Sequence, residues 1–165
     1  MTDKEMLKIL CFILKTFMNL KDNNIYIYNQ KYFIPKDNDI YVCVGIQGEK
    51  VLFGNNNKTI DNIEEINLYK KIAVAVDIYS TDISVLEKKD EIKMAFNSDL
   101  CETMMEKYFF KIGREPIASN VIKDSYPAEL LYRYNYIYSV VLRNTKQIGT
   151  MNYYDINNVK IFNND

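Results

Sequence analysis

Hydrophobic and polar positions alternate most clearly in the middle of the chain, over residues 72–79. The alternation predicts a β-strand with one large aliphatic face, formed by Ile72, Val74, Val76 and Ile78. The other face carries Ala73, Ala75, Asp77 and Tyr79. The polar residues at 80–82 break the alternation, so we expect the strand to end there.

After this strand the apolar positions recur at steps of three or four residues, which predicts one long helix over residues 84–109. Ser84 and Glu87 have the spacing of a capping box at its start. Gly113 is the expected stop. At about 1.5 Å per residue the helix would be about 35–40 Å long, enough to lie across a small sheet.

A second capping box, Thr2 and Glu5, predicts an N-terminal helix that ends near Leu20. Its apolar stripe consists of Met6, Leu10, Ile13, Phe17 and Leu20. Such a stripe is typical of a helix that packs on a sheet, and the alternative use is a partner surface.

The remaining periodic segments are short and rich in β-branched and aromatic residues, and we expect strands at residues 25–28, 40–46, 51–53, 117–123, 130–143 and 153–162. Turns are expected at residues 47–50 and 145–151. The Asn-rich segment around 54–68 is predicted to be an extended loop or arm between two strands. We therefore expect residues 1–165 to form one α+β domain, with a mostly antiparallel sheet and with the N-terminal helix and one long central helix packed on one face.

One face of the strand at 130–143 is a row of aromatic residues, with Tyr132, Tyr134, Tyr136 and Tyr138 followed by Val140 and Leu142. The favoured interpretation is a half-buried sheet face. A protein interface is the second interpretation, and stacking of nucleic-acid bases on the rings is the third.

Composition narrows the possible chemistry. The net charge of −1 provides no overall basic field for nucleic acid. The absence of histidine removes the commonest general base and zinc ligand. Cys11, Cys43 and Cys101 are far apart among apolar residues, so we expect buried free thiols in a reducing compartment.

Neither a phosphate-binding glycine loop nor a nucleophile beside a base occurs, so we expect a protein that is not an enzyme and has no catalytic residues, cofactor or metal. Asp77 and Asp82 could bind Mg²⁺ or act in acid–base chemistry, but a turn residue and a helix cap are the favoured interpretation. Residues 9–14 are apolar but too few to span a bilayer, and no signal peptide is expected.

Four segments together resemble the tail terminator proteins of long-tailed bacteriophages, also called neck or tail-completion proteins. Residues 6–20 resemble the opening helix of that family, and the Gln/Pro turn at 29–35 followed by the strand at 40–46 resembles its first long strand. The strand at 72–79 with the helix after it resembles its central unit. Asp124 and the aromatic segment at 132–138 resemble the approach to its late strand, although that strand is more aliphatic in the family.

The resemblance implies a structural virion protein of the neck, between head and tail, which is assembled in the host cytoplasm. Its subunits form a ring, typically a hexamer, that caps the tail tube, ends tail polymerisation and offers a docking face to head-completion or connector proteins. DNA would pass through the lumen without sequence-specific binding, and no membrane is involved. The alternatives are another head–tail connector, a tail tube subunit or a tail assembly protein. A small metal-dependent enzyme or binding module is a further alternative, from another class.

A closed ring needs head-to-tail contacts, which arms and edge strands commonly supply. The predicted arm is therefore the main candidate for the contact with a neighbouring subunit or the tube. The full candidate set is Asn55, Asn56, Asn57, Lys58, Glu64, Glu65, Arg114, Glu115 and Arg133.

Overall fold

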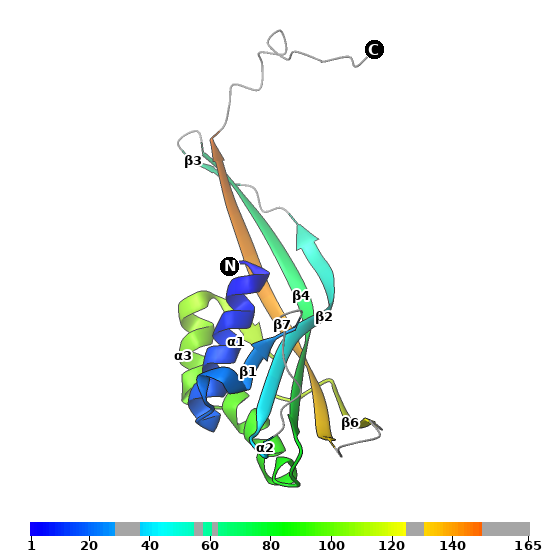
Figure 1. The fold of residues 1–165 in the computed structure, drawn as a ribbon. Helices are drawn as coiled ribbons and strands as arrows, with labels where there is room; N and C mark the ends of the chain where they lie inside the picture. Colours follow the sequence, from blue (N-terminus) through cyan, green and yellow to red (C-terminus); the bar gives the residue numbers. More distant parts are fainter. Residues whose placement is uncertain (29–36, 55–57, 61–62, 125–130, 150–165) are drawn as a thin grey trace, which may run out of the picture.

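The computed structural model describes residues 1–28, 37–54, 58–60, 63–124 and 131–149 (Figure 1). The helices of this part are α1 (Asp3–Met18), α2 (Val85–Phe96) and α3 (Asp99–Tyr108), with a 3₁₀ turn at Asp22–Asn24. Its strands are β1 (Ile25–Ile27), β2 (Tyr41–Gly54), β3 (Lys58–Ile60), β4 (Ile63–Ser80), β5 (Phe110–Ile112), β6 (Ala118–Asp124) and β7 (Leu131–Gly149).

All seven strands belong to one sheet, whose main order is β1-β2-β4-β7-β5. β3 pairs with the beginning of β4, and β6 pairs with β7 beside β5. Every pairing is antiparallel except that of β1 with β2. The three helices gather on one face of the sheet (Figure 1), which confirms the predicted α+β class.

α1 begins as its sequence predicts. The Thr2 hydroxyl accepts a hydrogen bond from the Glu5 backbone N–H at 3.2 Å, and the Glu5 carboxylate accepts one from the Thr2 N–H at 2.7 Å. The buried residues of the helix are Met6, Leu7, Leu10, Ile13, Leu14 and Met18. Phe17, predicted to be part of the buried stripe, is 40% exposed, because Leu14 and Met18 occupy the face that meets the sheet.

The predicted long central helix is divided into α2 and α3 at Asn97 and Ser98. Ser98 has an extended backbone and its hydroxyl accepts a hydrogen bond from the Cys101 N–H, so it caps a new helix. The capping box predicted at Ser84 does not form, since its hydroxyl makes no cap hydrogen bond. The predicted stop at Gly113 is also wrong, because α3 ends at Tyr108. The next residue, Phe109, has the left-handed conformation with φ of 55°, like Asn19 after α1 with φ of 53°.

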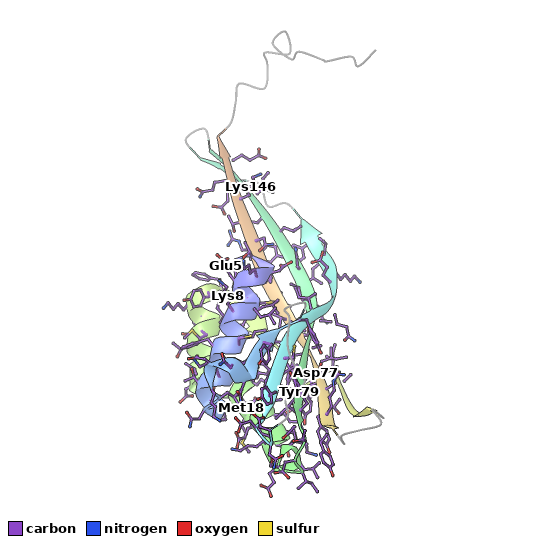
Figure 2. All side chains as sticks on the ribbon, in the orientation of Figure 1. Glu5, Lys8, Met18, Asp77, Tyr79 and Lys146 are labelled. Carbon is purple, nitrogen blue, oxygen red and sulfur yellow. The ribbon has the colours of Figure 1, made fainter. Side chains whose placement is uncertain are left out.

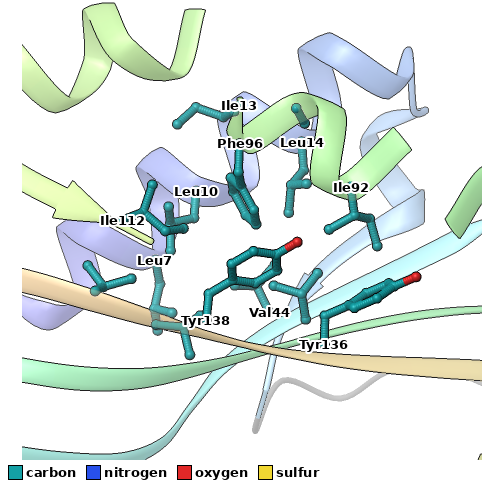
Figure 3. Packing of buried hydrophobic residues seen from close by; sticks show 14 of the residues in the cluster. Leu7, Leu10, Ile13, Leu14, Val44, Ile92, Phe96, Ile112, Tyr136 and Tyr138 are labelled. Atoms are coloured by element: carbon teal, nitrogen blue, oxygen red, sulfur yellow. The ribbon is translucent and has the colours of Figure 1, made fainter. Parts of the chain in front are cut away.

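The core lies between the helices and the covered face of the sheet (Figure 3). The aliphatic face predicted for residues 72–79 is completely buried there, which confirms the predicted orientation of β4. Tyr136 and Tyr138 also point into this core, so the favoured interpretation of the tyrosine row is confirmed. The Tyr138 ring packs edge-on against Phe96, with 4.7 Å between the centroids.

β2, β4 and β7 are longer than their sequences predict. β2 runs through the turn predicted at residues 47–50, with irregularities in its register after Ile46 and Val51. β4 includes residues 63–68, and β7 includes residues 144–149, where an arm and a turn were expected. The predicted strand at 153–162 lies outside the described residues.

Candidate functional site

The outer ends of β4 and β7 form a ribbon that continues past the end of β2, with β3 at its tip. We call residues 58–60, 63–67 and 145–149 the arm. The last residue pair between β2 and β4 is Gly54 with Leu68, so the arm extends beyond it by about 17 Å. Figure 1 shows that the arm projects past the helices. The described part of the predicted arm is therefore a paired β-ribbon.

A polar network at the root of the arm joins its two long strands. Asn67 is 3% exposed, and its side-chain oxygen accepts hydrogen bonds from Arg143 Nε at 2.6 Å and from the Thr145 hydroxyl at 2.8 Å. Arg143 Nη2 also donates to Glu65 at 2.8 Å, and the Asn67 amide donates to the same carboxylate at 3.1 Å. The hydrogen bond from Asn67 lowers the pKa of Glu65, so this carboxylate stays charged and bound to the network.

The two sides of the sheet end in edges that other strands cover only in part. On the outer side of β2, β1 pairs with Val42, Cys43 and Val44 alone. On the outer side of β7, β6 covers residues 131–137 and β5 covers residues 140–142. Within the described part of the chain, residues 46–54 of β2 and 143–149 of β7 therefore have no strand partner on these sides.

Exposed apolar side chains accompany both edges. Val51, Leu52 and Phe53 on β2 are 50%, 42% and 59% exposed. At the other edge, an open groove of about 890 Å³ lies between α3, β5 and β7. Tyr69, Met105, Phe109, Phe110, Val141 and Arg143 contribute to its lining. Unprotected edges and apolar surface of this kind favour contact with another chain.

The structure does not bring the predicted interface residues together. Glu64 and Glu65 lie on the arm, as does the backbone of Lys58, whereas Asn55, Asn56 and Asn57 lie outside the described residues. Arg114 is exposed and pairs with Glu102 at 2.6 Å, and Glu115 beside it is also exposed.

Arg133 lies near the opposite end of β7 from the arm. The register pairs Arg133 with Tyr79 and Gln147 with Glu65, fourteen positions apart on β7, or about 45 Å in an extended strand. Figure 2 shows the same separation, with Lys146 on the arm and Asp77 and Tyr79 far below it.

Arg133 belongs to a buried polar cluster on the uncovered face of the sheet. The Asp77 carboxylate is 1% exposed and accepts hydrogen bonds from Arg133 Nη2 at 2.8 Å and Asn135 Nδ2 at 2.7 Å. Asp82 instead accepts from the Ile83 N–H in the following turn. The two carboxylates thus serve different local structures, and the described residues contain no group of three or more His, Cys, Asp or Glu that could hold a metal ion.

The three cysteines are free, and two of them, Cys43 and Cys101, are buried as predicted, while Cys11 is half-buried. Burial raises the pKa of the Cys11 thiol to about 12 and those of Cys43 and Cys101 to about 11. Since the thiolate is the reactive form, burial lowers the reactivity of all three thiols near neutral pH.

Comparison with protein-family models and with curated protein sequences found no match to this chain. Among the described residues, no helix has the length and apolar character needed to cross a membrane. The edges, the arm and the groove are thus the features of the structure on which a functional argument can rest. Sequence reasoning located the arm but missed Asn67, Arg143 and Thr145, because nothing in a polar segment shows that it pairs with another one far along the chain.

Proposed function

We propose that this protein is a structural subunit of a phage neck, which forms a ring that caps the tail tube and ends its polymerisation. The observation that carries the proposal is the pair of uncovered strand edges at opposite sides of one sheet. The sequence resemblance to tail terminators supports the same function. The proposed role is geometric, and the protein would not be an enzyme.

A ring needs two different surfaces on each subunit, so that the contact passes from one copy to the next in the same sense. The edges of β2 and β7 meet this requirement. Both strands run antiparallel to β4, so they point in the same direction. Rotation about an axis keeps that direction, so a ring that continues the sheet would join β7 of one copy to β2 of the next as parallel strands.

The side chains beside the edges suit such a contact. Val51, Leu52 and Phe53 would leave water against the apolar groove of the neighbouring copy. The arm would then reach along the ring axis toward the tail tube or over the neighbouring subunit.

The layered architecture favours one orientation of the sheet in the ring. Helices need more room than bare strands, and the outside of a ring has the larger circumference. The helices would therefore lie outside, and the uncovered face would line the lumen through which DNA passes without sequence-specific binding. The other ring face would receive head-completion or connector proteins.

The first test is the length of tails, measured by electron microscopy in particles from a phage lacking this gene. Overlong tails without heads are expected if the protein ends polymerisation. Tails of normal length joined to heads would refute the proposal. Normal tails left unjoined would refute tail termination and indicate a connector, and long tubes formed by the purified protein alone would indicate a tube subunit.

A pair of variants tests the edge contact. The double variant Val51→Lys with Phe53→Lys adds two charges at the β2 edge, and it should give overlong tails. The matched control, Phe12→Lys with Phe17→Lys, changes two exposed residues of α1, which are 47% and 40% exposed. Normal tail length in both variants, with both proteins folded, would show that the β2 edge is not the ring contact.

A further inference from the structure

Three lysines form a row across the uncovered face of the sheet. The register places Lys50 on β2 opposite Lys71 on β4, Lys71 opposite Val141 on β7, and Val141 opposite Lys111 on β5. Directly opposed residues share a face, so all three lysines point to the same side. All three are exposed. With about 4.8 Å between strands, the row is about 14 Å wide.

This lysine row is not neutralised within the described part of the chain. Lys50, Lys71 and Lys111 form no ion pair there, although other charges on the same face are paired. Asp77 pairs with Arg133, and Glu65 pairs with Arg143. Like charges directly opposite each other on neighbouring strands are destabilising, as Lys50 and Lys71 are here. The row therefore concentrates positive charge on a protein whose net charge is −1.

The surface beside the row is low and open. Gly48, Ala73 and Ser139 lie next to it, and together with Glu49, Ile72, Ile117 and the two lysines of β2 and β4 they border a hollow of about 310 Å³. The Glu49 carboxylate is paired with Lys70 at 3.2 Å. Small side chains leave the lysine stems free to reach outward. A protein partner would more commonly be met by aromatic and arginine anchors, which this hollow lacks.

We infer that the lysine row contacts the phosphate backbone of duplex DNA. Lysine ammonium groups attract phosphate as point charges and can move from one phosphate to the next, so they suit contact without sequence recognition. This inference rests on the proposed function for its setting, because a ring with the uncovered face inward would place one row per subunit around the lumen. Each row alone would bind the DNA weakly, and the rows of all subunits together would centre the DNA while it passes.

The test is an NMR titration of the ¹⁵N-labelled protein with a 24-base-pair duplex at low salt, repeated at several salt concentrations. Amide shifts should concentrate around Lys50, Lys71 and Lys111. The triple variant with glutamine at these positions should bind about tenfold more weakly or worse. For this variant, the slope of log affinity against log salt concentration should be smaller in magnitude by about 2–3, as expected for the loss of three phosphate contacts.

The matched control replaces Lys4, Lys8 and Lys107 with glutamine. These lysines are exposed on the helices, and their replacement removes the same charge. It should bind the duplex like the wild type. Equal weakening in both triple variants, or wild-type shifts away from the row, would overturn the inference. So would binding of polyglutamate at the row without binding of the duplex, which would indicate an acidic protein partner.

Tail length separates this inference from the proposed function. The single variant Lys71→Gln, on the central strand β4, should still give tails of normal length, since Lys71 lies at neither edge of the sheet. Overlong tails with this variant would show that the row belongs to the ring contact and would overturn the DNA assignment. Overlong tails in the gene deletion, together with no DNA contact at the row, would leave the neck function supported and this inference refuted.

Discussion

Tyr138→Phe should stabilise the protein, although it removes a polar group from the core. Tyr138 is 0% exposed, and its hydroxyl oxygen is buried without a hydrogen-bond partner among the described residues. The ring packs on Phe96 in an edge-to-face contact at an interplanar angle of 75°, which phenylalanine would keep. Only the unsatisfied hydroxyl changes (Figure 3).

The magnitude follows from two opposing effects. In the unfolded chain the hydroxyl is hydrated, and burying it without a partner destabilises the folded state by about 1–3 kcal/mol. Removing it leaves a small void, which at about 24 cal/mol per Å³ costs only a few tenths of a kcal/mol. We therefore expect the free energy of unfolding to rise by about 1–2 kcal/mol, with an increase in Tm of about 3–6 °C for a chain of this size.

Urea unfolding followed by circular dichroism measures this change. Tyr134→Phe is the matched control, because Tyr134 is half-buried and its ring lies under Lys89, a contact that phenylalanine preserves. The control should stay within about 0.5 kcal/mol of the wild type. A loss of 1 kcal/mol or more in Tyr138→Phe would refute the reasoning, since it would show that the hydroxyl is hydrogen-bonded in solution.

Three further predictions concern the backbone and the pH dependence of stability. Phe109→Gly should raise the free energy of unfolding by about 1 kcal/mol, because glycine adopts the left-handed backbone at φ 55° without strain. The side chain that is lost is 80% exposed, so little burial is lost with it. Phe109→Ala should show no such gain. Gly45→Ala should lower the free energy of unfolding by about 1–3 kcal/mol, since the new Cβ would lie 1.7 Å from Cδ2 of Tyr28. Gly48→Ala should be tolerated, because the space around Gly48 is open. Stability should fall as pH rises above about 10, because burial raises the pKa of Tyr136 to about 12 and the unfolded chain therefore releases that proton first. Urea unfolding at pH 9, 10 and 11 checks this, and the Tyr136→Phe variant should lose part of the dependence; an equal slope in both proteins would contradict it.

The periodicity of apolar side chains was sufficient to predict local secondary structure and which side of each element is buried. It located the two faces of β4, the cap of α1, the aromatic face of β7 and the strand that became β6. Each of these depends on residues near one another in the sequence, such as Thr2 and Glu5. The helical break at Ser98 was also a local feature, but the continuous apolar pattern on both sides of it concealed the cap.

Contacts between distant segments decided the remaining structure. Residues 63–68 and 144–149 contain many polar side chains, and they became strands because they pair with each other. At the root of this pairing Asn67 contacts Arg143, 76 positions away. The same kind of contact joins Asp77 to Arg133, 56 positions away. A sequence pattern shows which side chains share a face, but strand order and register depend on which segments meet.

The amino-acid sequence by itself therefore determined the types of elements, their buried faces and the absence of histidine chemistry. Only the tertiary structure decided the order of the strands, which edges stay uncovered and which lysines share a row. The physical reason is that periodicity follows from the geometry of one strand or helix, whereas edges and rows are set by register between strands that the chain brings together from far apart.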